Sequence, residues 1–294
     1  MSKPGFKKVA IIGVGLIGGS LALVMREKGL AGEIVGVGRG QANLDLALEL
    51  GLVDSVTTDV VEGVKDADLV FVAVPVLKIT DTVRKALPGL KPGAIVTDGG
   101  SVKASIIDEV EGILPQGVHF VPGHPIAGTE NSGAGAAFST LYNDRVCILT
   151  PTGRTDAGAL EAVAGLWKEA GSRVVAMDPE AHDRVLAAVS HLPHMIAYSL
   201  VNTVADLEDE GMKVLDYSAG GFRDFTRIAS SSPEMWADIC ALNKTAILDM
   251  IDSFTARLAS LRELIEGGDV GALTDDFSSA KEVRDSLVEK GGGE

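Results

Sequence analysis

The sequence predicts an α/β protein in two parts, a doubly wound, mainly parallel sheet over residues 1–178 and an all-α domain over residues 179–294. Three observations carry this prediction. Glycines at positions 13, 15 and 18 follow an apolar run directly and open a helical one. Apolar runs then alternate with helical segments as far as Asp178, as in parallel strands joined by right-handed crossovers. After Pro179 the strand patterns stop and long helical patterns continue.

The first part begins with a buried strand, because Val9–Gly13 is apolar throughout, and Gly18–Lys28 is the helix that follows it. The same alternation predicts strands Glu33–Gly38, Leu69–Val74 and Ala94–Asp98, with helices Asn43–Leu50 and Lys78–Leu87 between them. We expect three further strands to extend this sheet, Val118–Val121, Arg145–Leu149 and Arg173–Ala176. Such a sheet is covered by helices on both faces, which is the Rossmann-type arrangement.

The helical part is predicted to pair with a second copy of the chain. Long helical patterns cover Trp236–Leu264 and Asp275–Glu289, and Met250, Phe254 and Leu258 recur every four residues on one helix face. A domain of about 110 residues with helices of this length often buries an apolar face against a partner subunit. We therefore expect a homodimer, with a self-contained bundle as the alternative.

Composition argues against several classes of function. The chain has 294 residues and a formal net charge of −15, which repels nucleic acid and anionic membranes. Val9–Met25 is uncharged like a signal or membrane segment, but the glycines within it have a better explanation. Cys147 and Cys240 show neither metal-binding nor redox spacing. We expect a cytoplasmic protein that acts on a small molecule.

The glycine motif has the form of a dinucleotide fingerprint. Gly13 allows a tight turn, Gly15 lets the backbone approach a pyrophosphate, and Gly18 lets helix and strand pack closely. The amides of Leu16 and Ile17 then lie at a helix N-terminus, which favours phosphate. The alternative is a glycine-rich turn that binds nothing.

The choice between NAD and NADP stays open. NAD-preferring folds carry Asp or Glu about 20 residues after the last fingerprint glycine. Gly38 occupies that place here and Arg39 follows it, which slightly favours NADP because an arginine accommodates a 2′-phosphate. In an NAD enzyme Arg39 would be a solvated residue or would stack on adenine. Pro75 follows the third strand at the cofactor crevice and is a further candidate contact, although a chain-reversing proline explains it equally well.

Two motifs place polar side chains after strands of the predicted sheet. "GHPIAGTE", residues 123–130, puts His124 before a proline, on a segment predicted to be a constrained loop. "TDGGSVK", residues 97–103, offers Ser101 to a substrate hydroxyl and Lys103 to an anion, unless Ser101 only caps a helix. Removing hydride from an alcohol carbon needs a base for the hydroxyl proton, and a histidine titrates in the right range.

Two more motifs lie in the helical part. "SHLPH" places His191 and His194 on one helix face, with Pro193 predicted to kink the helix between them, and "RDFTRIASSSPEMWADI" contains Arg227. Three of the five histidines fall in these motifs, and such a trio could hold a metal ion. No carboxylate shows metalloenzyme spacing, so we expect no metal.

Together these motifs resemble the prephenate/arogenate dehydrogenase family of tyrosine biosynthesis. The ordered set "GVGLIGGSLAL", "DGGSVK", "GHPIAGTE", "SHLPH" and "RIASSSPEMWADI" spans roughly residues 8–285. The resemblance implies oxidative decarboxylation of prephenate to 4-hydroxyphenylpyruvate, or of arogenate to tyrosine, with hydride transfer to NAD(P)⁺.

The resemblance also implies roles for individual residues. His124 accepts the proton of the ring hydroxyl and Ser101 assists it. Arg227 holds a substrate carboxylate, and His194, with His191, contacts the substrate. Two acidic residues, Glu130 and Asp224, match residues that gate the pocket through ion pairing.

Two other readings compete with this one. A β-hydroxyacid dehydrogenase shares the two-domain plan but uses a lysine base on the first interdomain helix, where "SHLPHMIAYSLVN" has none. A nucleotide-sensing protein would have kept the fold and lost catalysis, which the joint presence of the motif residues argues against. Because the chain ends soon after the helical part, we expect no fused mutase or regulatory domain.

Overall fold

The computed structural model describes residues 5–129, 131–209 and 213–291. The chain forms two compact units, Met1–Lys244 and Thr245–Glu294. Within the described residues, no helix combines the length and the apolar character that crossing a membrane requires.

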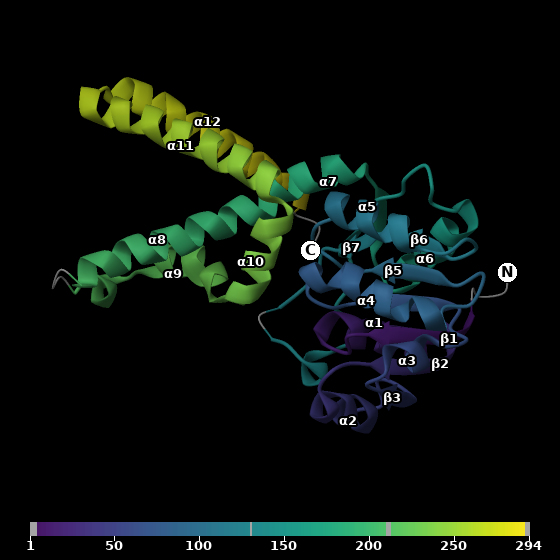
Figure 1. Ribbon diagram of the computed structural model, residues 1–294. Helices are drawn as coiled ribbons and strands as arrows, with labels where there is room; N and C mark the ends of the chain where they lie inside the picture. The colour runs from purple at the N-terminus through teal and green to yellow at the C-terminus, as the bar shows by residue number, and fades with distance from the viewer. Residues whose placement is uncertain (1–4, 130, 210–212, 292–294) are drawn as a thin grey trace. The chain divides into compact units, whose positions relative to one another are not determined.

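A six-stranded parallel sheet lies at the centre of the first unit (Figure 1), in the order β3-β2-β1-β4-β5-β6. Its strands are β1 (Phe6–Ile12), β2 (Ala31–Val37), β3 (Ser55–Thr57), β4 (Leu69–Val72), β5 (Ile95–Asp98) and β6 (His119–Val121). The helices between them are α1 (Leu16–Glu27), α2 (Gln41–Glu49), α3 (Val60–Val64), α4 (Ile79–Ala86) and α5 (Ala104–Ile113), with short 3₁₀ turns η1 (Val76–Lys78) and η2 (Leu87–Gly89). The strand order reverses between β1 and β4, and in such sheets ligands bind beyond the carboxyl ends of the strands at that point.

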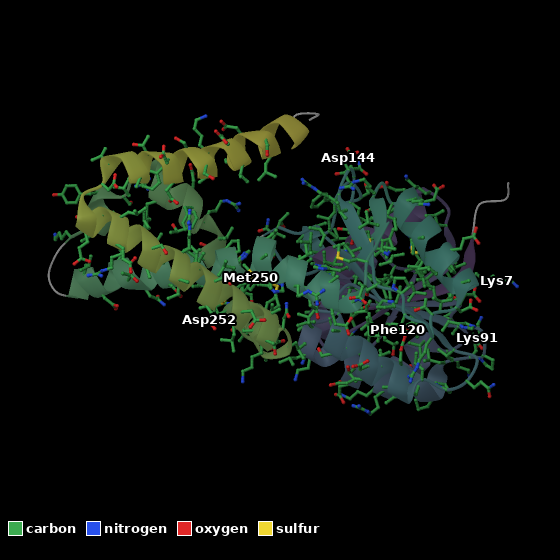
Figure 2. The ribbon with its side chains drawn as sticks, turned by 90° about the horizontal axis from the view of Figure 1, so that it is seen from above. Lys7, Lys91, Phe120, Asp144, Met250 and Asp252 are labelled. Atoms are coloured by element: carbon green, nitrogen blue, oxygen red, sulfur yellow. The ribbon has the colours of Figure 1, made fainter. Side chains whose placement is uncertain are left out.

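Buried side chains hold the sheet and its helices together. Trp167, on α6 (Ala157–Glu169), is fully buried and meets the rings of Phe71 and Tyr142 edge-on, at centroid distances of 5.8 and 5.1 Å. At the amino end of the strands, Asp68 accepts hydrogen bonds from the Lys7 amide and the Lys91 ammonium, and Figure 2 shows both lysines at this end. The predicted Rossmann-type arrangement is confirmed.

One part of the sheet prediction is wrong. Arg145–Leu149 and Arg173–Ala176 do not extend the parallel sheet; they form β8 (Val146–Leu149) and β9 (Arg173–Ala176) of a separate sheet, in the order β7-β8-β9. The missing strand is β7 (Gly123–Pro125), which pairs antiparallel with β8 and places His124 opposite Ile148. His124 therefore lies in a strand and not in the predicted loop. Pro122 causes the difference, because it has no amide to continue β6 and the chain turns there into the second sheet.

Helices make up the rest of the first unit. They are α7 (Pro179–Leu186), α8 (Leu192–Asp209), α9 (Gly220–Thr226) and α10 (Pro233–Leu242), with short turns η3 (Ala134–Ala136), η5 (Leu215–Tyr217) and η6 (Arg227–Ser230). The predicted kink at Pro193 takes another form: a π-helical turn, η4 (Ala187–His191), precedes α8, and Pro193 is the second residue of α8. Proline donates no amide hydrogen bond, so the helical register changes just before it.

The second unit contains two long helices, α11 (Lys244–Gly267) and α12 (Val270–Gly291). Gly268, at φ +67°, makes the turn between them, and Arg257 forms an ion pair with Asp276 across them. Exposed apolar side chains remain on both helices, including Leu258, Phe277 and Val283. Helices with apolar side chains in water are typical of surfaces that bind another chain.

Candidate active site

The fingerprint loop has the geometry that a dinucleotide requires. Gly13 has a φ of +98°, and a Cβ there would lie 2.2 Å from the carbonyl oxygen of Ala73. A Cβ on Gly18 would lie 2.2 Å from the carbonyl oxygen of Gly13, whereas nothing lies within 4 Å of one on Gly15. Gly13 and Gly18 are therefore needed for close packing, whereas Gly15 leaves open space for a pyrophosphate.

Three backbone amides at the start of α1 face no acceptor within the helix. The first helical hydrogen bond runs from the Gly19 amide to the Gly15 carbonyl at 2.8 Å, so the amides of Leu16, Ile17 and Gly18 remain for an anion. A nicotinamide dinucleotide fits these residues.

The structure gives fewer contacts for the other candidate cofactor residues, Gly38, Arg39 and Pro75. A Cβ on Gly38 would lie 3.2 Å from Leu44, so an acidic side chain there would need Leu44 to move. Arg39 is exposed on the loop after β2. Pro75 is exposed and precedes the turn η1 at the carboxyl end of β4.

A chain of hydrogen bonds runs behind His124 into the protein. His124 Nδ1 lies 2.9 Å from His182 Nε2, and His182 Nδ1 lies 2.8 Å from a carboxylate oxygen of Asp183. The Asp183 carboxylate also accepts from the amides of Lys103 and Ala104, both at 2.9 Å, and so caps the N-terminus of α5. Ser101 does not cap this helix. Sequence reasoning missed His182 and Asp183, because no motif joins α7 to β7.

The hydrogen bonds fix where the protons lie in this chain. A carboxylate only accepts, so His182 Nδ1 carries a proton and donates it to Asp183, which leaves His182 Nε2 as an acceptor. His124 Nδ1 therefore donates to His182, and the unprotonated Nε2 of His124 is left to act as a base. A histidine oriented by a second group through its far nitrogen is the arrangement of a general base.

A buried ion pair holds the strand that carries His124. The Lys103 ammonium is fully buried, binds the Asp98 carboxylate and donates to the Gly123 carbonyl at 2.8 Å. Asp98 also accepts from the amides of Gly100 and Gly123, at 2.9 and 3.2 Å. The anion that Lys103 binds is therefore a residue of the protein. Ser101, in the loop between Asp98 and Lys103, has a hydroxyl with no hydrogen-bond partner among the described residues.

A second group of histidines adjoins the first. His194 stacks on Trp236 with a centroid distance of 3.8 Å, and the buried His191 meets Trp236 edge-on at 5.8 Å. The amide nitrogen of Asn243 lies 3.2 Å from His191 Nδ1 and 2.8 Å from the carbonyl oxygen of Asp183. Asn243, which no motif indicates, thus connects the two histidine groups. The Trp236 indole nitrogen is buried and has no hydrogen-bond partner in the part of the chain that the structure describes.

The remaining candidates lie at the edge of these groups. Arg227 is exposed at the start of η6, close enough for its charge to act on His194. Asp224 is exposed on α9 and forms no ion pair with any residue that the structure describes. Glu130 falls outside the described residues. No cluster of His, Cys, Asp or Glu suited to a metal ion occurs in the described parts of the chain.

The environment favours the neutral forms of His124 and His194. Burial lowers the pKa of His124 well below 6.5, and the neighbouring His182 and the Lys103 ammonium also disfavour a positive charge on it. Burial also lowers the pKa of His194, against the effect of its hydrogen bond to the Ser190 carbonyl, and the Arg227 charge adds to the lowering. Neutral His124 is the form that accepts a proton.

His191 makes a testable contribution to stability. Burial lowers its pKa to about 4, so the folded state binds a proton less readily than the unfolded chain, and stability is lost as pH falls from 6.5 towards 4. We expect this group to cost about 2–3 kcal/mol of the free energy of unfolding between pH 7 and pH 4.5. Urea unfolding of wild type and His191→Gln at both pH values measures it, and an equal loss in both proteins would contradict it.

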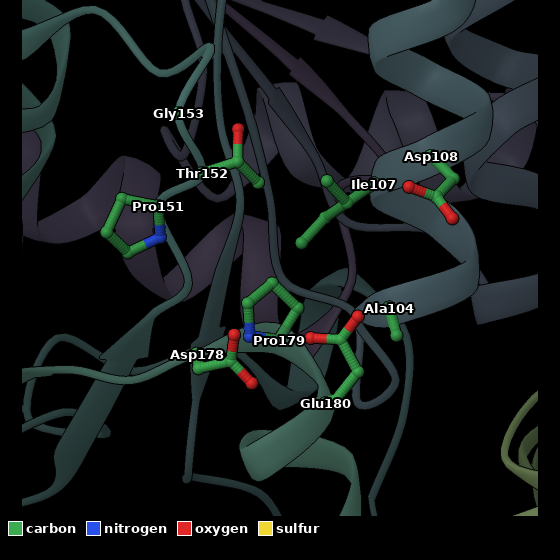
Figure 3. Close-up of a pocket in the computed structure, with 9 residues that line it drawn as sticks. All are labelled: Ala104, Ile107, Asp108, Pro151, Thr152, Gly153, Asp178, Pro179 and Glu180. Carbon is green, nitrogen blue, oxygen red and sulfur yellow. The ribbon is translucent and has the colours of Figure 1, made fainter.

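A pocket elsewhere on the first unit does not suit an anionic substrate. It has a volume of about 340 Å³ and lies between α5, the turn after β8 and the start of α7 (Figure 3). The carboxylates of Asp108, Asp178 and Glu180 line it, whereas none of the candidate histidines does. Like charges repel, so the histidine groups are the better candidate site.

Comparisons with known proteins show the family to which this chain belongs. A family model described as the prephenate dehydrogenase nucleotide-binding domain matches residues 21–176, and one described as the prephenate dehydrogenase dimerization domain matches residues 178–279. A cyclohexadienyl dehydrogenase of Zymomonas mobilis is 41% identical over 96% of both chains.

Two solved structures are similar along nearly the whole chain. One is prephenate dehydrogenase from A. aeolicus in complex with hydroxyphenyl propionate and NAD⁺, with a TM-score of 0.91 and 38% identity over 96% of this chain and 98% of that one. The other is Synechocystis arogenate dehydrogenase, with a TM-score of 0.81 and 30% identity over 96% of this chain and 100% of that one. The chain belongs to the prephenate dehydrogenase family, as its sequence motifs predict.

Proposed function

We propose that this protein catalyses the oxidative decarboxylation of prephenate to 4-hydroxyphenylpyruvate with NAD⁺ or NADP⁺. The observation that carries the proposal is the His124–His182–Asp183 chain, which leaves the second imidazole nitrogen of His124 to act as a base, in the same unit as a fingerprint loop that fits a dinucleotide. Family membership supplies the substrate class.

The proposed mechanism assigns each group one task. When bound at the fingerprint loop, NAD⁺ or NADP⁺ would supply the acceptor for the hydride that leaves the ring carbon bearing the hydroxyl. His124 Nε2 takes the hydroxyl proton, with the Ser101 hydroxyl as a second hydrogen-bonding group, so that a ketone forms at that carbon. The ring carboxylate then leaves as carbon dioxide, and its bonding electrons make the ring aromatic. His124 returns its proton to the phenolate oxygen, which restores the neutral base.

Arg227 is proposed to hold a substrate carboxylate. A guanidinium binds a planar carboxylate through two parallel hydrogen bonds, and one such charged contact contributes about 1.5–3 kcal/mol. Arg227→Ala should therefore raise KM for prephenate about 10- to 150-fold and change kcat little.

Steady-state kinetics measures this effect, with Arg223→Ala as the matched control. Arg223 is likewise exposed, lies about one helical turn away, and hydrogen-bonds to Ser218. An unchanged KM in Arg227→Ala, or an equal rise in Arg223→Ala, would remove Arg227 from the substrate site.

Arogenate is a second candidate substrate, and one contact favours it. His194 Nδ1 lies 2.9 Å from the Ser190 carbonyl oxygen, so it donates there and neutral His194 presents Nε2 as an acceptor. The ammonium of arogenate can donate to that nitrogen, whereas the keto group of prephenate cannot. To donate a hydrogen bond to the keto group of prephenate, His194 would first have to take up a proton at Nε2.

One assay separates these proposals. Purified full-length protein is supplied with prephenate or arogenate, each with NAD⁺ or NADP⁺, and reduced nicotinamide is followed by absorbance. The exposed Arg39 and the lack of an acidic residue at Gly38 support NADP as the better cofactor. Absence of turnover with all four combinations would overturn the proposed function.

We further propose that residues 1–178 bind the dinucleotide and residues 179–294 complete the substrate site and form a homodimer. The description of the second family model and the exposed apolar side chains of α11 and α12 support the dimer. A cytoplasmic location is supported by two free cysteines, since disulfides are rare in reducing compartments.

A further inference from the structure

Asn43, in the first turn of α2, bridges two segments that are distant in the sequence. Its amide nitrogen donates to the Val14 carbonyl at 2.8 Å, and its amide oxygen accepts from the Ala134 amide at 2.8 Å. Both functional groups of one side chain are therefore used, one on the fingerprint loop and one on the chain that follows His124. Neither contact is indicated by a sequence motif.

The contact with Val14 fixes one peptide unit of the fingerprint. The Val14 carbonyl accepts from Asn43, and the amide of the same unit, on Gly15, donates to the Gly13 carbonyl at 3.0 Å. Because a peptide unit is planar, holding both its ends sets its orientation. Gly15 precedes α1, so this orientation determines where the free amides of the first helical turn point.

The contact with Ala134 belongs to a set that fastens residues 133–142, here called the crossing segment, over α1. The Phe138 amide donates to the Ser20 hydroxyl at 3.0 Å, and the Tyr142 hydroxyl donates to the Ile17 carbonyl at 2.5 Å. A Cβ on Gly19 would lie 2.9 Å from that of Ala137. The crossing segment therefore packs directly on α1, the helix whose N-terminus is the proposed pyrophosphate site.

Gly133 makes the approach to Asn43 possible. Its φ of +82° is rarely adopted by other residues, and a Cβ there would lie 3.2 Å from the Asn43 amide oxygen. The backbone is therefore arranged to bring the Ala134 amide onto Asn43.

We propose that Asn43 is a positioning residue for the dinucleotide, holding the Val14–Gly15 peptide so that the amides of Leu16, Ile17 and Gly18 point at the pyrophosphate. This role rests on the proposed use of NAD⁺ or NADP⁺. Asn43 does not touch the cofactor in this proposal; it acts through the backbone of the fingerprint. Asn43 follows Arg39 closely in the chain, so α2 connects the ribose end of the site to the pyrophosphate end.

Two variants of similar volume separate the two contacts. Asn43→Asp keeps the acceptor for Ala134 and replaces the donor to Val14 with an oxygen that repels the carbonyl, whereas Asn43→Leu removes both groups. We expect Asn43→Asp to weaken dinucleotide binding about tenfold and Asn43→Leu at least as much. KM for prephenate should stay unchanged, which a general structural defect would not allow.

Isothermal titration of the full-length protein with NAD⁺ and with NADP⁺ makes the measurement, and Asn202→Asp on the exposed surface of α8 is the matched control for the added charge. Binding within twofold of wild type in either Asn43 variant would overturn the proposal, as would an equal loss in Asn202→Asp. A wild-type protein that binds neither dinucleotide would instead overturn the proposed function.

Discussion

His124→Asn should lower kcat about 10²- to 10⁴-fold and leave KM for prephenate nearly unchanged. Asparagine keeps a polar group of similar shape near the hydroxyl but cannot take up its proton at neutral pH. The ring carbon would then have to lose hydride while its hydroxyl keeps its proton, which leaves the positive charge of a protonated ketone on the substrate. Binding is affected much less, because the carboxylate contacts lie elsewhere in the proposed site.

The pH dependence distinguishes loss of the base from loss of structure. The pKa of His124 is lowered well below 6.5 by burial and by His182 and Lys103, so the base stays neutral at pH 6.5 and kcat/KM should fall only at lower pH. His119→Asn, a histidine on β6 that hydrogen-bonds through its backbone, is the control and should retain full activity. If His124→Asn turned over at the wild-type rate, another group would have to be the base.

Much of the fold follows from local sequence, and the errors have identifiable causes. The fingerprint and the alternation of strands and helices predict β1, β2, β4, β5 and β6 because each includes two or more consecutive apolar residues. β7 escaped prediction because it has three residues, ends in Pro125 and follows Pro122. Its pairing with β8 depends on residues about 25 positions away, which periodicity does not report.

The candidate site was likewise predicted only in part, because contacts between distant residues leave no local pattern in the sequence. Motifs point to His124, His191, His194 and Arg227, since each lies in a short stretch that combines histidine or arginine with proline, glycine or serine. Residues that act by touching those side chains carry no such signal. Asp183 lies within α7 and Asn243 directly after α10, and no motif marks either; only folding brings the Asn243 amide to the Asp183 carbonyl and to His191.

His182→Leu should lower kcat by about 10²- to 10³-fold without removing any group that touches the substrate. The leucine offers no acceptor for the Nδ1 proton of His124, so the imidazole loses the partner that holds its Nε2 unprotonated and aimed at the substrate. The charged imidazolium that forms during turnover also loses the hydrogen bond that connects it to the Asp183 carboxylate. KM for prephenate and the affinity for the dinucleotide should stay close to wild type.

Rescue by a conservative variant decides whether His182 acts through these hydrogen bonds. The glutamine side chain carries both an NH2 donor group and a carbonyl acceptor, so His182→Gln can donate to Asp183 and accept from His124, and it should recover part of the lost kcat. His119→Leu controls for replacing a histidine by leucine in the same unit. Equal kcat losses in His182→Leu and His182→Gln would mean that packing is responsible. Wild-type kcat in His182→Leu would mean that His124 needs no partner behind it. If His182→Gln recovers part of the kcat that His182→Leu loses, His182 sets the position of the proton on His124.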